Sequence, residues 1–117
     1  MSQPLALLLS ILIEAAVAAG LVAALRWAPA WRAALAAAAG TLVTHWAVWA
    51  GMPPLTAAIG YWWALPVVEG LVVLAETLAY RLVARLSWPR ALLVSFLANA
   101  ASTAAGLLIW WLRTRSL

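Results

Sequence analysis

Four long, continuous apolar runs constrain the fold of this chain more than any other feature of its sequence. They cover residues 5–25, 33–51, 57–80 and 91–112. A helix that crosses the hydrocarbon core of a bilayer needs about 20 predominantly apolar residues. Of the 117 residues, 68% are hydrophobic and 9% are charged, too few charges to cover a water-soluble domain. We therefore predict one all-α domain, residues 1–117, that crosses a membrane as a compact antiparallel four-transmembrane-helix bundle.

Residues that typically end helices separate the four runs. The segment Arg26-Trp27-Ala28-Pro29 closes the first run, and Met52-Pro53-Pro54 closes the second. Ser87-Trp88-Pro89 precedes the fourth run and predicts an N-cap followed by a proline in the first turn. We expect short turns between the helices.

The positions of tryptophan and arginine indicate where the predicted helices end in the membrane and which side of the membrane each turn faces. Tryptophan prefers the membrane–water interface, and eight of the nine tryptophans fall near a predicted span end, with only Trp46 deeper. The eight are Trp27, Trp31, Trp49, Trp62, Trp63, Trp88, Trp110 and Trp111. The loops after the first and third runs carry Arg26, Arg32, Arg81, Arg85 and Arg90. Because cytoplasmic loops are rich in arginine, we predict that these loops face the cytoplasm and that both termini face outward.

Five strongly polar side chains interrupt the apolar runs: Glu14, His45, Glu69, Glu76 and Asn99. Such residues within a membrane usually face the protein interior. Helical spacing of three, four and seven places each of them on one polar face of its helix. The face of the third run is formed by Trp62, Pro66, Glu69, Val73, Glu76 and Tyr80. The face of the fourth run is formed by Ser95, Asn99, Ser102 and Gly106, and that of the second run by Ala37, Thr41, Thr44, His45 and Val48. We expect these faces to meet.

Two interpretations of this polar set stay open. In the first, Glu14, Glu69 and Asn99 join helices through hydrogen bonds, with the glutamates protonated. In the second, the side chains form a loose ladder that carries protons or cations across the bilayer. Contacts to a partner protein, a pigment or a lipid form a further possibility.

Several functional classes lack the residues that they need. A single histidine and no cysteine give no usual metal site, and no H-E-x-x-H motif is present. The chain has no aspartate and no nucleophile–base arrangement, so we predict that it is not an enzyme. No motif identifies a cofactor, and seven dispersed arginines do not predict a nucleic-acid surface.

Small residues at a spacing of four indicate close helix packing. They are Ala16, Gly20 and Ala24 in the first run and Ser102 and Gly106 in the fourth. The first set lies nearly opposite Glu14 on its helix, so the first helix is predicted to pack on two sides, one of them against a neighbour outside this chain.

The second half of the chain resembles a set of small, uncharacterised prokaryotic membrane proteins with four predicted helices. The motifs that carry the resemblance are Thr44-His45, Glu69-x6-Glu76-x4-Arg81 and Ser95-x3-Asn99-x2-Ser102-x3-Gly106. Those proteins commonly have proline after the histidine, where this chain has Trp46. The resemblance implies a shared fold, a shared polar core and a multi-pass location in a prokaryotic inner (cytoplasmic) membrane, but no particular activity.

A second resemblance is to the small multidrug resistance transporters, which have four helices and work as dimers. Their essential membrane carboxylate lies in the first helix, where Glu14 stands in Ile11-Leu12-Ile13-Glu14-Ala15-Ala16, and Trp63 is similarly placed in the third. The glycines that usually follow that glutamate are missing here.

Two functional hypotheses follow. The first is a non-enzymatic membrane subunit or scaffold, joined by its polar cluster and partnered by other membrane-protein subunits or a second copy. The alternative is a small proton-coupled transporter or ion path that uses Glu14 and Glu69.

Overall fold

The computed structural model describes residues 2–116 and contains four helices: α1 (Gln3–Ala24), α2 (Ala30–Ile59), α3 (Tyr61–Val83) and α4 (Trp88–Arg115). All four are long and apolar enough to cross a membrane, which confirms the predicted all-helical class and the number of candidate spans. Alanine and leucine dominate the helices, and both residues favour helical backbone.

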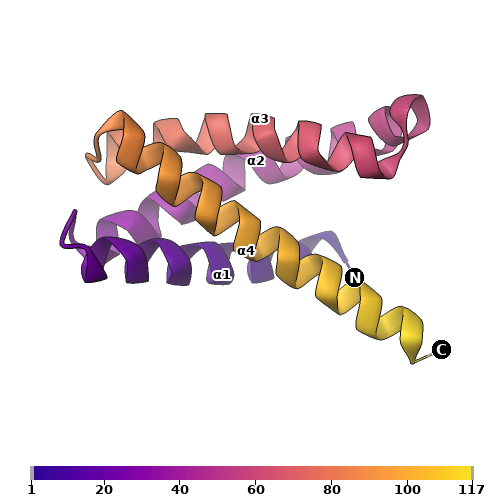
Figure 1. The fold of residues 1–117 in the computed structure, drawn as a ribbon, viewed down its shortest axis with the longest axis horizontal. Helices are drawn as coiled ribbons and strands as arrows, with labels where there is room; N and C mark the ends of the chain where they lie inside the picture. The colour runs from indigo at the N-terminus through magenta and orange to yellow at the C-terminus, as the bar shows by residue number, and fades with distance from the viewer. Residues whose placement is uncertain (1, 117) are drawn as a thin grey trace.

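The helices stand around a ring in chain order (Figure 1). Helix α1 packs against α2 and α4, and α3 packs against the same two, whereas the diagonal pairs make no close contact in the described part of the chain. The α1–α2 and α3–α4 turns lie together at one end, which we call the turn end (Figure 1). The termini and the α2–α3 turn lie at the other, which we call the open end, where α4 diverges from α3.

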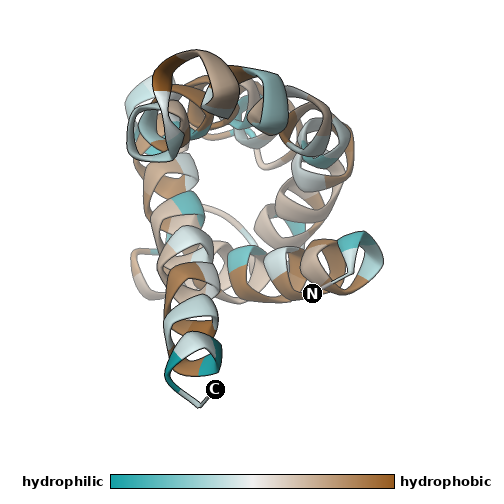
Figure 2. Cartoon of the chain, turned by 90° about the vertical axis from the view of Figure 1, so that its right-hand side faces the viewer, coloured by the Kyte–Doolittle hydropathy of each residue, from teal (hydrophilic) through white to brown (hydrophobic). Residues whose placement is uncertain are grey.

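The tightly packed core lies near the turn end. Apart from the large ring of Tyr80, it is built from small and medium side chains that flank the two turns: Ala18, Val22, Ala33, Ala36, Ala37, Ala84, Leu86, Ala91 and Val94. Alanine allows helix backbones to approach closely. Large apolar side chains cover the outside instead, including Leu12, Val43 and Trp63. Figure 2, which views the molecule from the open end, shows hydrophobic residues on all four helices.

Both turns at the turn end place an arginine in the left-handed backbone region. Arg26 has φ 56° and Arg85 has φ 57°, each one residue after a helix C-cap. After Arg26, the Trp27 N–H donates to the Val22 carbonyl at 2.9 Å, which closes the end of α1. At the start of α4, Ser87 is the N-cap and Pro89 lies in the first turn, as the sequence predicted.

The end of the second helix differs from the prediction. Met52-Pro53-Pro54 does not stop α2, which continues to Ile59, so α3 begins at Tyr61 rather than near residue 57. Proline removes one backbone donor but keeps a φ angle that a helix accepts. The residue that ends α2 is Gly60, with φ 84° and ψ 153°, a region that is essentially restricted to glycine.

This longer helix changes the position of one tryptophan. Trp49 was predicted near a span end, but ten residues of helix separate it from Ile59, a rise of roughly 15 Å. Trp49 therefore lies well within α2 rather than at its end. The other tryptophans that are predicted near span ends lie in the turns or within the first or last two turns of helices.

Replacing Gly60 with alanine should destabilise the fold by about 1–3 kcal/mol, because a Cβ is strained at this φ and ψ. Thermal unfolding of the purified protein in detergent measures the effect. Gly51→Ala is the matched control, since Gly51 is helical and an added Cβ there meets nothing within 4 Å. Equal melting temperatures for the two variants would contradict the assignment of Gly60 as the helix breaker.

Candidate functional site

A buried hydrogen-bonded group near the middle of the bundle joins all four helices. The Thr41 hydroxyl of α2 lies within hydrogen-bond distance of the Glu14 carboxyl of α1 and of the Glu76 carboxyl of α3, the latter at 3.0 Å. The Asn99 amide of α4 donates to Glu76 Oε2 at 2.8 Å and to the Ser95 carbonyl at 2.9 Å. We call Glu14, Thr41, Glu76 and Asn99 the carboxyl cluster.

All members of the carboxyl cluster are buried, each with no more than 5% of its surface exposed. The Thr41 hydroxyl carries one proton and can donate to only one carboxyl group at a time. A protonated second carboxyl group could complete the other contact by donating to the threonine oxygen. The arrangement of two carboxyl groups around one hydroxyl is therefore consistent with at least one of the two glutamates being protonated.

Gly40 permits the close approach of α2 and α3 at the carboxyl cluster. A Cβ added to Gly40 would lie 3.1 Å from Glu76 Cγ and 3.3 Å from Ala79 Cβ. The neighbouring Thr44 hydroxyl donates to the Gly40 carbonyl at 3.0 Å. Sequence reasoning did not single out Gly40 as a site residue, and it placed Thr41 on a polar face without giving it a role. The available signal was that Thr41 follows Ala37 and precedes His45 at a spacing of four.

Further hydrogen bonds hold α4 against its neighbours on either side. The Ser95 hydroxyl donates to the Val73 carbonyl of α3 at 2.8 Å. The Ser102 hydroxyl donates to Ser10 Oγ of α1 at 3.3 Å. Ser95 and Ser102 belong to the polar face predicted for the fourth helix, so this face meets both adjacent helices.

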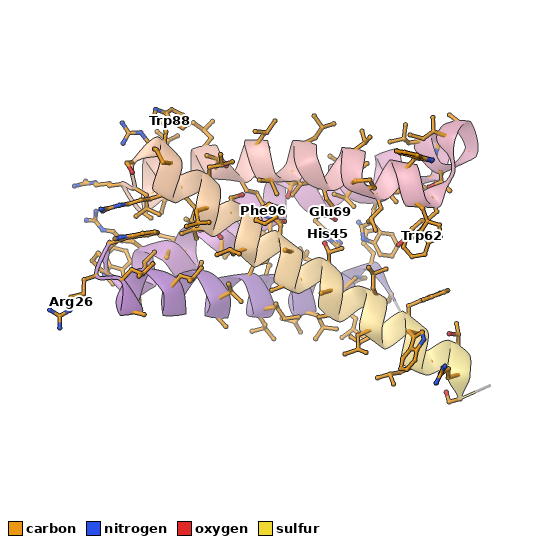
Figure 3. All side chains as sticks on the ribbon, in the orientation of Figure 1. Arg26, His45, Trp62, Glu69, Trp88 and Phe96 are labelled. Carbon is orange, nitrogen blue, oxygen red and sulfur yellow. The ribbon has the colours of Figure 1, made fainter. Side chains whose placement is uncertain are left out.

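Glu69 lies apart from the carboxyl cluster, on the wall of cavities that begin towards the open end. It is two helical turns before Glu76, a rise of roughly 10 Å. One cavity of about 450 Å³ is lined by Glu69, Thr103 and the aromatic side chains of Trp49, Tyr61 and Trp110. Figure 3 shows Glu69 at mid-length of the bundle and Trp62 at the open end.

A second cavity extends from Glu69 towards the carboxyl cluster. It has a volume of about 490 Å³, lies between α3 and α4, and is lined by Glu69, Phe96 and Asn99 among others. Asn99 donates to Glu76, so this cavity ends one hydrogen bond away from the buried Glu76 carboxyl group. Both cavities have largely apolar walls, and Glu69 lines each of them between the open end and the carboxyl cluster.

His45 does not join the carboxyl cluster. Its side chain is buried, its ring lies 5.8 Å from the Trp49 ring, and its Nε2 makes no hydrogen bond with the described residues. Among the residues that the structure describes, no three His, Cys, Asp or Glu side chains are close enough together to hold a metal ion.

The predicted site residues therefore separate into three groups. Glu14, Glu76 and Asn99 meet, Glu69 lines the cavities, and His45 packs on Trp49. The three predicted packing residues also differ in their contacts. Ser102 bonds to α1, whereas Gly20 and Gly106 have nothing within 4 Å of an added Cβ.

The fold and the site define a class of protein: four apolar helices around a buried group of carboxylic side chains. No family model, no curated protein and no solved structure matches this chain. The two resemblances noted from the sequence therefore remain predictions.

Replacing Thr41 with valine should destabilise the protein by about 1–3 kcal/mol, because it leaves buried carboxyl groups without their shared partner. Thr41→Ser should retain most of the stability, since it keeps the hydroxyl. Thr77→Val is the matched control, because Thr77 is also buried and its hydroxyl donates to the Val73 carbonyl of its own helix. Denaturant unfolding in micelles measures all three, and a Thr41→Val loss no larger than that of Thr77→Val would contradict the role of the cluster.

Proposed function

We propose that the chain is a multi-pass protein of a prokaryotic inner membrane, with four antiparallel spans, the turn end in the cytoplasm and both termini outside. The support is the apolar exterior together with five arginines at the turn end. Large hydrophobic side chains such as Leu12, Val43 and Leu71 are more than half exposed on the isolated chain, and acyl chains are the natural environment for such a surface.

Within the membrane, we propose that the protein provides a proton-linked path, as a small transporter or ion path, in which Glu69 and Glu14 bind protons. The observation that carries this proposal is the position of Glu69 between two cavities, one towards the open end and one that reaches Asn99. A carboxyl group on a cavity wall can exchange protons with water or with a bound cation.

The carboxyl cluster extends this path to Glu14. Asn99 links the inner cavity to Glu76, and Thr41 lies between Glu76 and Glu14. A hydroxyl between two carboxyl groups can accept a proton from one and pass its own proton to the other. The same cluster joins the helices, so the structural and the proton-binding interpretations of Glu14 are compatible.

Proton flux tests this proposal directly. Purified protein in liposomes, with an imposed pH gradient and a pH-sensitive dye inside, should show pH-dependent flux that Glu69→Gln or Glu14→Gln abolishes. Glutamine keeps the shape and hydrogen-bonding capacity of the side chain but carries no exchangeable acid proton. Ser102→Ala is the control, because Ser102 is polar, lines a neighbouring cavity and has no acidic group. Flux that is unchanged in both glutamine variants would refute the proposal.

A second candidate function, that of a non-enzymatic subunit or scaffold of a larger membrane complex, has its own supporting observation. The small residues Ala16, Gly20 and Ala24 form an exposed strip on α1, and nothing lies within 4 Å of a Cβ added to Gly20. Small residues on an exposed strip permit close approach of another helix. A partner subunit or a second copy would fill this strip.

Extraction of the protein from native membranes in mild detergent tests this second candidate. We expect a stoichiometric membrane-protein companion, or a dimer, that Gly20→Leu releases because the larger side chain blocks the strip. Gly70→Leu is the matched control, because Gly70 is also helical with nothing within 4 Å but lies on α3. Recovery of the wild-type protein alone and monomeric would remove the support for this function.

A further inference from the structure

The turn end carries an unusual concentration of positive charge. Five of the seven arginines gather there, and we call Arg26, Arg32, Arg81, Arg85 and Arg90 the arginine face. Figure 3 shows Arg26 projecting from this end on the α1 side and Trp88 on the opposite side, at the start of α4. All but Arg32 are exposed.

The arginine face has no carboxylate of its own chain to balance it. The only side-chain carboxyl groups are those of Glu14, Glu69 and Glu76. Glu14 and Glu76 bond to Thr41 inside the bundle, and Glu69 lies further towards the open end. The compensating anions must therefore come from outside the chain.

Helix electrostatics explain only part of this concentration. Arg26 and Arg85 follow the C-termini of α1 and α3, where a positive charge is favourable. Arg32 and Arg90, however, are each the third residue of α2 and α4, where a positive charge is unfavourable. An external anion at this end would offset that repulsion.

Two of the guanidinium groups are held in place. Arg81 donates to the Leu86 carbonyl at 3.0 Å, and its Cζ lies 5.5 Å from the Trp88 ring. The Cζ of Arg90 lies 4.9 Å from the ring of Trp27, which links the two turns. A guanidinium stacked on an indole keeps the N–H groups of its edge available to phosphate oxygens. The Leu86 carbonyl uses one Nη1–H of Arg81, and the remaining N–H groups of Arg81 can still donate to a phosphate.

We propose that the arginine face binds the phosphate group of an anionic phospholipid, with Arg81 and Arg90 as the principal contacts. Trp27, Trp31 and Trp88 lie among these arginines, and tryptophan prefers the level of lipid headgroups. The phosphate supplies the missing negative charge, and the lipid places it at the depth of the indoles. This proposal rests on the proposed membrane insertion but not on proton flux.

Native mass spectrometry of the purified protein with an equimolar mixture of dioleoyl phosphatidylglycerol and dioleoyl phosphatidylcholine tests the proposal. We expect retention of phosphatidylglycerol over phosphatidylcholine, and a loss of about 10- to 30-fold in that preference in Arg81→Gln/Arg90→Gln. The matched control is Arg113→Gln/Arg115→Gln, which removes the same charge from the open end and should keep the preference.

A conservative variant and a competitor complete the experiment. Arg81→Lys/Arg90→Lys keeps the charge and should retain part of the preference, which separates lipid binding from a folding defect in the glutamine variant. Millimolar inorganic phosphate should not displace the lipid; full displacement would make free phosphate the ligand and overturn the proposal. Equal retention of the two lipids by the wild-type protein would also overturn it and would favour an acidic protein partner. Neither result depends on the flux measurement.

Discussion

The hydroxyl of Thr41, placed between the carboxyl groups of Glu14 and Glu76, fixes the rotation of the helices around it. A buried polar group without a partner costs far more than a buried apolar group. Each helix must therefore turn its polar residue towards the same point, and Asn99 brings α4 to that point as well. Alanine contacts alone would not distinguish one rotation of a helix from the next, because they are nearly alike on every face.

The two ends of the bundle differ in packing because they differ in side-chain size. Mostly alanine and valine, with Leu86 and the ring of Tyr80, fill the space between the helices beside the two turns. Trp49, Tyr61 and Trp110 face the cavity towards the open end, together with Pro53 of α2. Large rings hold the helices apart where small side chains would draw them together. The cavities that expose Glu69 follow from this gradient in side-chain size.

The charge distribution follows the same axis. Carboxyl groups lie in the middle of the bundle, and five arginines lie at the turn end, where three of them lie over indole rings. The structure thereby separates an acidic interior from a basic rim. An acidic interior suits protons or cations, and a basic rim suits the phosphates of a headgroup layer. The two proposals use different parts of the molecule for this reason.

The sequence by itself determined the helical class, the number of candidate spans, the N-cap at Ser87 and the polar faces of the helices. These features depend on local composition and on helical periodicity, which a single chain displays directly. The sequence predicted the wrong end for α2. Pro53 and Pro54 suggest that a helix ends, but α2 continues past them, and the sequence does not show that Gly60 has a positive φ angle.

Only the tertiary structure decided which polar residues meet. Periodicity places Glu69 and Glu76 on one face of α3, yet Glu76 reaches Thr41 and Asn99 while Glu69 remains on a cavity wall. The difference arises because α4 diverges from α3 towards the open end, and helix crossing depends on side-chain packing between segments far apart in the chain. Gly40 shows the same dependence, since its lack of a side chain matters only where Glu76 of another helix comes within about 3 Å of the missing Cβ.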